Sequence, residues 1–246
     1  ETLTPRYTSK VLQLLDAVAP TSTPPTPDSG AWPDPPVVQS PNPSPAPLPP
    51  GTKPAPGSPW YLYVGYEESH VPLFAAPDWQ NTSRRGPYGD TTQQMDASIG
   101  AILQKLRDTG MDKNTLVVFT SDNGAWIDPS NGLGGDANPM AGGSNAPFRG
   151  GKGSTWEGGM REPAVVWGAI PPDAAGDTCM EVTSMMDIMP TFLDLAGVSL
   201  PSVPLDGKSW AGLLNTTAVQ RQRRHVARSR YISETTAALV RNYPLA

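Results

Sequence analysis

Two oxygen-bearing side chains follow a strongly hydrophobic run near the middle of the chain. The run 115–120 is followed by Ser121 and then by the tripeptide Asp122-Asn123-Gly124. In open α/β sheets, ligands bind beyond the carboxyl ends of the strands, so we expect Asp122 and Asn123 at a site-forming edge. A carboxylate beside an amide carbonyl offers two hard oxygen ligands, which suit Ca²⁺ or Mg²⁺. The alternative interpretation is an ordinary turn, because this tripeptide is common in turns.

A histidine follows a second hydrophobic segment. His70 lies in the sequence Ser69-His70-Val71-Pro72, directly after the aromatic run 60–66. An imidazole at the same edge can donate a hydrogen bond to an oxyanion or act as a proton donor. The alternative is a loop histidine without a chemical role. The second histidine, His225, lies in the arginine-rich stretch 221–230, which we interpret as a solvated loop or helix face.

Lys152 lies in the glycine-rich stretch 148–163. Glycines allow the backbone to approach a ligand closely, and a lysine supplies a compact positive charge for an anionic oxygen. The stretch is not a P-loop, because the G-x-x-x-x-G-K-[ST] spacing fails at Gly153. For Arg161, in the same stretch, we favour a structural ion pair or a loop-holding role over an anion-binding role.

Hydrophobic runs predict the strands that must carry these residues. Aromatic and β-branched composition predicts a buried strand over 60–66, a central strand over 115–120 and another strand over 163–168. Helical patterns occur before and between these runs. Strands that alternate with helices predict an α/β layered fold with a mainly parallel sheet and flanking helices.

Three helices are predicted from apolar spacing and end signals. The first covers 8–18, where the apolar residues share one broad face. The second starts at the capping-box pattern Asp90-x-x-Gln93 and stops at Gly110. The third covers 187–197, with Asp187 as its N-cap and Gly197 as its stop signal.

Composition divides the chain into segments and excludes some functions. Sixteen of the 30 prolines fall between Pro20 and Pro59, a segment too poor in apolar residues to form a core. We therefore predict a helical piece over 1–19, a disordered proline-rich insertion over 20–59, an α/β domain over 60–215 and the start of a small C-terminal subdomain over 216–246. The net charge of -5 argues against a nucleic-acid groove, and no apolar run is long enough for a membrane span.

Four motifs occur in an order that resembles the sulfatase family. They are SHVP, FTSDNG, GGKGSTWEGGMREP and DIMPTFLDLAG, and the similarity runs from about Trp60 to Gly207. The chain is most similar to the branch that contains arylsulfatase A and galactosamine-6-sulfatase. The resemblance implies an alkaline-phosphatase-like α/β fold with a small C-terminal antiparallel unit. It also implies hydrolysis of sulfuric esters.

The resemblance also implies roles for the residues singled out above. Asp122 and Asn123 look like the second half of a Ca²⁺ coordination set. Lys152 looks like the residue that contacts the sulfate, and His70 looks like the residue near the leaving-group oxygen. These roles suit the reaction, because sulfate-ester cleavage needs neutralised sulfuryl oxygens and help for the departing alkoxide.

The family's nucleophile is a formylglycine made within a C/S-x-P/A-x-R motif, and this sequence contains no such motif. The single cysteine, Cys179, lies in Asp177-Thr178-Cys179-Met180-Glu181 and is expected to be a packed or surface thiol. We therefore interpret the chain as the C-terminal part of a sulfatase whose formylglycine lies upstream. Alone, this fragment is expected to be inactive and to bind Ca²⁺ weakly, since two protein ligands fall short of the usual oxygen shell.

Two other functions remain open from the residues alone. One is a phosphodiesterase-like hydrolase on the same fold, and the other is a non-catalytic protein that binds sulfated glycans. The expected ligand of the leading interpretation is a sulfate ester, either an aryl sulfate or a sulfated sugar. Sequons at Asn81 and Asn215 are compatible with a glycoprotein of the secretory pathway, lysosomal or extracellular. The oligomeric state is not predicted.

Overall fold

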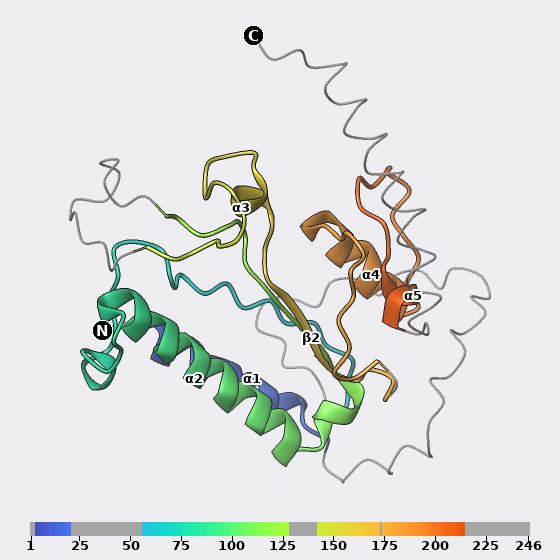
Figure 1. Ribbon diagram of the computed structural model, residues 1–246. Helices are drawn as coiled ribbons and strands as arrows, with labels where there is room; N and C mark the ends of the chain where they lie inside the picture. The colour runs from blue at the N-terminus through green and yellow to red at the C-terminus, as the bar shows by residue number, and fades with distance from the viewer. Residues whose placement is uncertain (1–2, 21–55, 128–141, 173, 215–246) are drawn as a thin grey trace. The chain divides into compact units, whose positions relative to one another are not determined.

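The computed structural model describes residues 3–20, 56–127, 142–172 and 174–214 (Figure 1). The chain divides into two compact units, with the change between Ala169 and Ile170 in the second half of the chain. The first unit contains α1 (Leu3–Val18), η1 (Pro77–Trp79), α2 (Gly86–Asp108), η2 (Met111–Asn114), β1 (Leu116–Thr120), α3 (Glu157–Met160) and β2 (Ala164–Gly168). The second unit contains η3 (Met185–Asp187), α4 (Ile188–Leu195) and α5 (Ala211–Leu214).

The core of the first unit lies where α1 packs alongside α2. Val11, Leu15 and Val18 recur on one face of α1 and form a buried cluster with Leu106 and Met111. Leu15 is 1% exposed and Leu106 is 2% exposed, so truncating either one to alanine is expected to cost about 2–5 kcal/mol. The helix predicted over 8–18 is confirmed, and it begins earlier, at Leu3.

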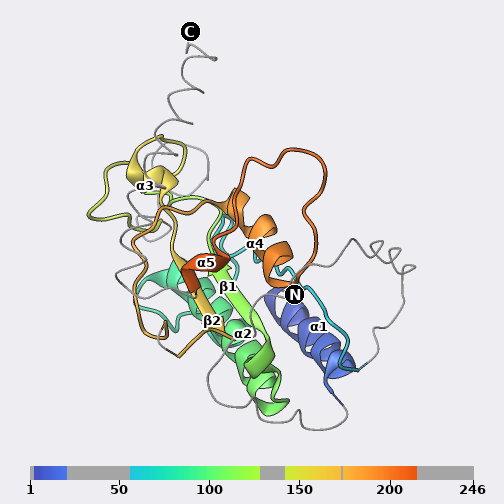
Figure 2. The same ribbon diagram turned by 90° about the vertical axis from the view of Figure 1, so that its right-hand side faces the viewer.

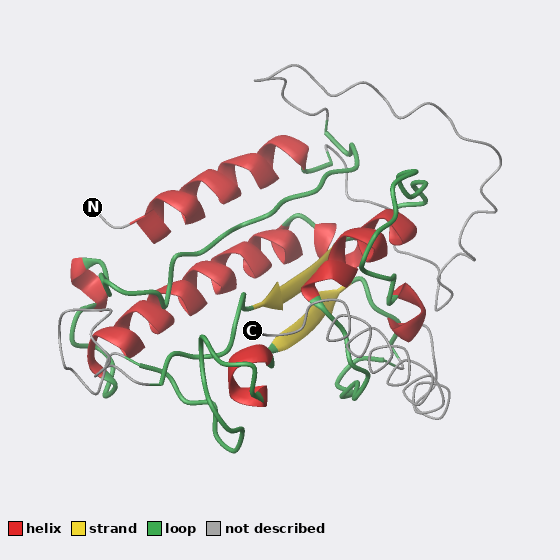
Figure 3. Ribbon diagram, turned by 90° about the horizontal axis from the view of Figure 1, so that it is seen from above, coloured by secondary structure: helices red, strands yellow, loops and turns green. Residues whose placement is uncertain are grey.

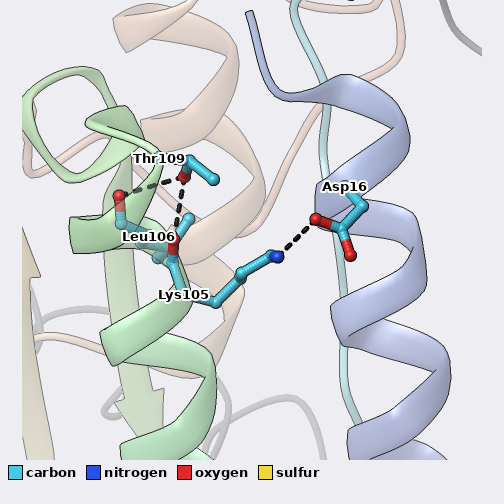
Figure 4. Close-up of polar contacts among 4 residues, drawn as sticks. All are labelled: Asp16, Lys105, Leu106 and Thr109. Carbon is cyan, nitrogen blue, oxygen red and sulfur yellow. Dashed lines mark hydrogen bonds and ion pairs between the residues drawn. The ribbon is translucent and has the colours of Figure 1, made fainter.

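Polar contacts join the same two helices near their carboxyl ends (Figure 4). Lys105 of α2 forms an ion pair with Asp16 of α1. One turn later, the hydroxyl of Thr109 donates to the carbonyl oxygens of Lys105 at 2.8 Å and Leu106 at 3.2 Å. Gly110 follows with a φ of 69°, the left-handed conformation that ends helices, so the predicted stop signal is confirmed.

The two strands predicted over 115–120 and 163–168 are confirmed as β1 and β2, which pair with each other (Figure 2). Their pairing is antiparallel, with Leu116 opposite Gly168 and Thr120 opposite Ala164. The mainly parallel sheet that we predicted is therefore absent from the described residues. Because the strands are antiparallel, the residues just before β2 lie beside the residues just after β1.

The segment 60–66 was predicted to be a buried strand, and this prediction is wrong in the described structure. The segment is extended but forms no strand, and it runs alongside α1 and α2 (Figure 3). Trp60, Leu62 and Val64 pack against the core cluster, whereas Tyr61 is 67% exposed and Tyr63 is 74% exposed. Because alternate residues point to opposite sides of an extended chain, only one side of the run is buried here.

The second predicted helix starts earlier than its capping-box pattern suggested. α2 begins at Gly86, so Asp90 lies inside the helix and does not cap it. The carboxylate of Asp90 is turned instead toward the preceding loop, where it accepts hydrogen bonds from the backbone amides of Asn81 and Ser83, both at 2.8 Å. A short polar side chain near a helix start can accept from the amides of the first helical turn or from those of the preceding loop. The local sequence pattern does not distinguish the two arrangements.

The second unit contains the helix predicted over 187–197. Asp187 occupies the N-cap position of α4, and Gly197 follows the helix with a φ of 65°. The carboxylate of Asp187 accepts hydrogen bonds from the backbone amides of Ser184 at 2.8 Å and Lys208 at 2.7 Å. Asp187 therefore ties the helix start to two flanking loops.

Parts of the predicted organisation are not tested by this structure. Most of the proline-rich segment 20–59, and the segment 216–246 predicted to start a small subdomain, lie outside the described residues, as does the arginine-rich stretch with His225. The domain boundaries stay predictions. Within the described ranges, no helix is both long and apolar enough to cross a lipid bilayer.

Candidate functional site

The end of β1 presents Asp122 and Asn123 at a tight backbone crossing. Asp122 is exposed and Asn123 is half-buried, and the hydroxyl of Ser121 donates to the carbonyl oxygen of Asn123 at 3.0 Å. The amide of Gly124 then donates to the carbonyl oxygen of Gly159 at 3.0 Å. A Cβ at Gly124 would lie 1.9 Å from the carbonyl oxygen of Gly158, so only glycine permits this approach.

The glycine-rich loop brings Lys152 to the same strand end. The backbone amide of Lys152 donates to the carbonyl oxygen of Ala125 at 3.0 Å, two residues beyond Asn123. Gly150 has a φ of 78°, in the left-handed region that favours glycine, and the side chain of Lys152 is exposed. The structure therefore brings together the backbone segments that carry Asp122, Asn123 and Lys152, which are about 30 residues apart in sequence.

A side chain that we did not predict joins these two segments. The amide of Asn145 hydrogen-bonds both the amide and the carbonyl of Ala125, at 2.9 and 2.8 Å, and reaches the carbonyl oxygen of Gly150 at 3.3 Å. These bonds link positions 20 residues apart. No local pattern of residue types marks such a contact, so the sequence contained no signal for it.

Glu162 is a second residue near the site that we did not single out. Continuing the antiparallel register from Thr120 and Ala164 places Glu162 opposite Asp122. Burial, and then the negative charge of Asp122, raise the pKa of the Glu162 carboxyl above its ordinary value. A second carboxylate therefore contributes negative charge beside the acid-amide pair.

His70 stands apart from this network in the described structure. Its Nδ1 lies 2.7 Å from the carbonyl oxygen of Val71, and the hydroxyl of the preceding Ser69 lies 2.9 Å from that of Thr92 in α2. Within the described ranges, the structure gives His70 no hydrogen bond to Asp122, Asn123 or Lys152. Thr92 of α2 thus contacts the segment that carries His70, and Arg85, the N-cap residue of α2, donates to the carbonyl oxygen of Gly142 at 2.7 Å.

Arginine and aromatic side chains pair within the glycine-rich loop. The guanidinium of Arg149 lies 3.8 Å from the ring centre of Trp156, and that of Arg161 lies 4.7 Å from the ring centre of Phe148. Arg161 also forms an ion pair with Glu157 at 3.5 Å. This pairing agrees with the loop-holding role predicted for Arg161. Cys179 is an exposed free thiol.

The oxygen donors at the end of β1 fit a divalent cation in kind but not in number. Asp122, Asn123 and the neighbouring Glu162 offer hard oxygen ligands. Across the residues that the structure describes, no group of three or more His, Cys, Asp and Glu side chains is arranged to hold a metal ion. The half metal site expected at Asp122 and Asn123 therefore stays a prediction.

These features define an α/β protein with a candidate site for an anionic ligand at the end of a strand. A family model described as Sulfatase matches residues 50–198, more than half of the chain. The chain therefore belongs to the sulfatase family, and the family predicted from the ordered motifs is confirmed.

Two curated relatives and one solved structure agree with this assignment. N-acetylgalactosamine-6-sulfatase of Mus musculus is 44% identical over 147 residues, which are 59% of this chain and 26% of the relative. Arylsulfatase A of Homo sapiens is 37% identical over 156 residues, which are 63% of this chain and 29% of the relative. This chain thus spans about a quarter of the length of the first relative and slightly more of the second.

The solved structure supports the fold. Ps i-CgsB in complex with k-i-k-neocarrahexaose aligns with a TM-score of 0.60 and 24% identity, over 88% of this chain and 39% of that chain. At this identity the likeness concerns the fold alone. Together with the family match, it confirms the predicted alkaline-phosphatase-like α/β fold class.

Proposed function

We propose that the full protein containing this chain hydrolyses sulfuric esters at the end of β1. The observation that carries the proposal is the backbone link between the Asp122–Asn123 turn and the Lys152 loop, made by the hydrogen bond from Lys152 to Ala125 at 3.0 Å. Two oxygen ligands for a metal ion and a lysine ammonium group, all carried at one strand end, suit the binding of a doubly charged tetrahedral group. Membership of the sulfatase family favours sulfate over phosphate as that group.

The acid-amide pair is assigned to a divalent cation, which we propose to be Ca²⁺. Asp122 and Asn123 would hold it by their side-chain oxygens, and the chain's own carboxylate at Glu162 adds negative charge nearby. When bound, the cation supplies charge neutralisation for sulfuryl oxygens. The remaining ligands and the formylglycine nucleophile are expected from the parts of the full protein outside this chain.

Lys152 is assigned to the sulfate itself. Its backbone is fixed by Ala125, and its exposed ammonium group is a compact charge with three donors for anionic oxygens. A lysine in this position stabilises the negative charge that develops on the oxygens during S–O cleavage. We therefore expect Lys152 to contribute more to turnover than to substrate affinity.

His70 is assigned to the leaving-group oxygen. A carbonyl oxygen can only accept, so the 2.7 Å contact with Val71 makes Nδ1 the protonated nitrogen. Nε2 is then the nitrogen that exchanges a proton with a ligand, and a doubly protonated ring can donate from it to a departing alkoxide.

The proposal is tested by assaying the purified full protein with an aryl sulfate. Lys152→Ala is expected to lower kcat/KM by about 10²–10³-fold, the effect of removing one stabiliser of developing charge. Lys113→Ala is the matched control, because Lys113 is an exposed lysine in η2, before the opposite end of β1, and should leave kcat/KM unchanged. An aryl phosphodiester and a sulfated oligosaccharide are tested in parallel. Hydrolysis of the phosphodiester alone, or binding of the oligosaccharide without hydrolysis, would contradict the proposal.

We further propose a sulfated sugar as the natural substrate and the secretory pathway as the route of the protein. The substrate class is supported by the relative named N-acetylgalactosamine-6-sulfatase. The route is supported by the sequon at Asn81, whose side chain is exposed, whereas Asn215 lies outside the described residues. A lysosomal or extracellular destination follows from this route.

A further inference from the structure

The side-chain amide of Asn145 pairs with the backbone of Ala125 at two points. Its Oδ1 accepts from the Ala125 amide at 2.9 Å, and its Nδ2 donates to the Ala125 carbonyl oxygen at 2.8 Å. In a flipped amide, the NH₂ group would face the N–H of Ala125 and the oxygen would face the Ala125 carbonyl oxygen. These two partners therefore define the orientation of the amide. The arrangement copies the way a backbone residue pairs with another in a sheet, and so it orders the chain beyond the end of β1.

The same amide also holds the loop that carries Lys152. Nδ2 reaches the carbonyl oxygen of Gly150 at 3.3 Å, while the amide of Lys152 binds the Ala125 carbonyl oxygen at 3.0 Å. A Cβ at Gly151 would lie 2.7 Å from the Ala125 oxygen and 3.1 Å from the Asn145 nitrogen. The two backbone segments are thus in close contact around one half-buried side chain.

We propose that Asn145 is a positioning residue, which fixes the Asp122–Asn123 turn relative to Lys152 through the backbone and without touching the substrate. Ala125 lies two residues after Asn123, and Gly150 lies two residues before Lys152, so small changes at the clamp displace both groups. The inference rests on the proposed function, which gives those side chains their chemistry. Backbone clamping suits such a site, because it leaves the exposed side chains of Asp122 and Lys152 available to a ligand.

The clamp is tested first by amide hydrogen exchange in the full protein. In Asn145→Ala, the amide of Ala125 loses its acceptor and is expected to exchange about tenfold faster. The amides of β1 should keep their wild-type rates. Asn145→Asp retains the shape of the side chain but puts a carboxylate oxygen in place of the NH₂ group that faces two carbonyl oxygens. This variant provides the test if the alanine variant does not fold. Unchanged exchange at Ala125 in Asn145→Ala, or unchanged exchange of the Lys152 loop in Asn145→Asp, would overturn the proposal.

The kinetic test asks whether Asn145 acts through Lys152. Asn145→Ala is expected to lower kcat for an aryl sulfate by about 10–100-fold, the usual effect of removing a support for a site residue, with KM little changed. In a Lys152→Ala background, the same substitution should lower kcat less than threefold, because coupled residues are not additive. Asn114→Ala, an exposed asparagine in η2, is the control and should match wild type.

The outcomes separate the clamp from the proposed function. Fully additive losses would show a merely structural role and overturn the positioning proposal while sulfatase activity stands. If the wild-type protein hydrolyses no sulfate ester, the proposed function fails, and the exchange rate of the Ala125 amide alone decides whether the clamp exists.

Discussion

The carboxylate of Asp90 accepts a hydrogen bond from the backbone amide of Ser83 at 2.8 Å, across the start of α2. Its other oxygen accepts from the amide of Asn81 at the same distance. Asp90 is only 4% exposed, so its carboxylate is shielded from water and takes these two amides as partners. The loop before α2 is therefore anchored by a residue from the second turn of the helix.

Replacing Asp90 should destabilise the protein. In Asp90→Asn, an NH₂ group faces one of the two amide donors, and a buried donor left without an acceptor costs about 1–3 kcal/mol. Chemical denaturation of the full protein at neutral pH measures the loss. Asp96→Asn, on the exposed side of the same helix, is the control and should change the stability by less than about 0.5 kcal/mol. Equal stability of the two variants would contradict the prediction.

Glu68 should make the stability depend on pH. Burial first, and then the charge of Glu67, raise the pKa of the Glu68 carboxyl above its ordinary value of 4.5, and its Oε2 is buried without a hydrogen-bond partner among the described residues. The folded state therefore binds this proton more tightly than the unfolded state. Stability falls as pH rises from about 4.5 through the raised pKa, and this loss is absent below that window.

Glu68→Gln removes the titrating group and should flatten this dependence. The stability of the variant relative to wild type is expected to increase between pH 4 and pH 7. Denaturant midpoints measured across this range check the sign. Glu67→Gln should relieve only the smaller, coulombic part of the effect. A difference between wild type and Glu68→Gln that does not vary with pH would exclude Glu68 as the source.

The 246-residue chain alone should not hydrolyse aryl sulfates. Its sequence contains no C/S-x-P/A-x-R motif, and no group of three or more His, Cys, Asp and Glu side chains among its described residues is arranged to hold a metal ion. Assays of this chain beside the full protein, each with and without Ca²⁺, give the comparison. Turnover by the chain alone that depends on Ca²⁺ would show the prediction wrong.

Asn81 should carry an N-linked glycan when the protein passes through a eukaryotic secretory pathway. Its side chain is exposed, and its φ of 61° places it in the left-handed region that asparagine tolerates better than most residues. Enzymatic glycan release in ¹⁸O-labelled water, followed by mass spectrometry, should detect labelled aspartate at this position and at no asparagine outside a sequon. Recovery of only unlabelled Asn81 from protein secreted by a eukaryotic host would contradict this prediction.

The features predicted correctly from the sequence are those encoded in neighbouring residues. β-branched runs predicted β1 and β2, and Gly110 and Gly197 predicted the ends of the second and third helices. The ordered motifs identified the family, because each of them is a run of neighbouring residues that can be recognised in the sequence. The carboxyl end of β1 also carries Asp122 and Asn123, as its position before them predicted.

The features that were missed depend on contacts between distant residues. The run 60–66 has the composition of a buried strand, but composition does not indicate whether a partner strand lies beside it. Asp90 binds amides seven and nine residues upstream, where a capping box would bind its own helix. Asn145 reaches across 20 residues to Ala125, and that relationship exists only once the chain has turned back after β1.

The register of β1 with β2, in which Thr120 pairs with Ala164, determines where Asp122 lies relative to the residues before β2. A slip of one residue between β1 and β2 would move Asp122 by about 3.4 Å along the strand and turn each β2 side chain to the opposite face. The hydrogen bond from Gly124 to Gly159 would then be lost. Val117, Val118 and Phe119 have no chemistry of their own, yet a substitution that loosens their pairing with β2 would displace Asp122 from the loop that carries Lys152.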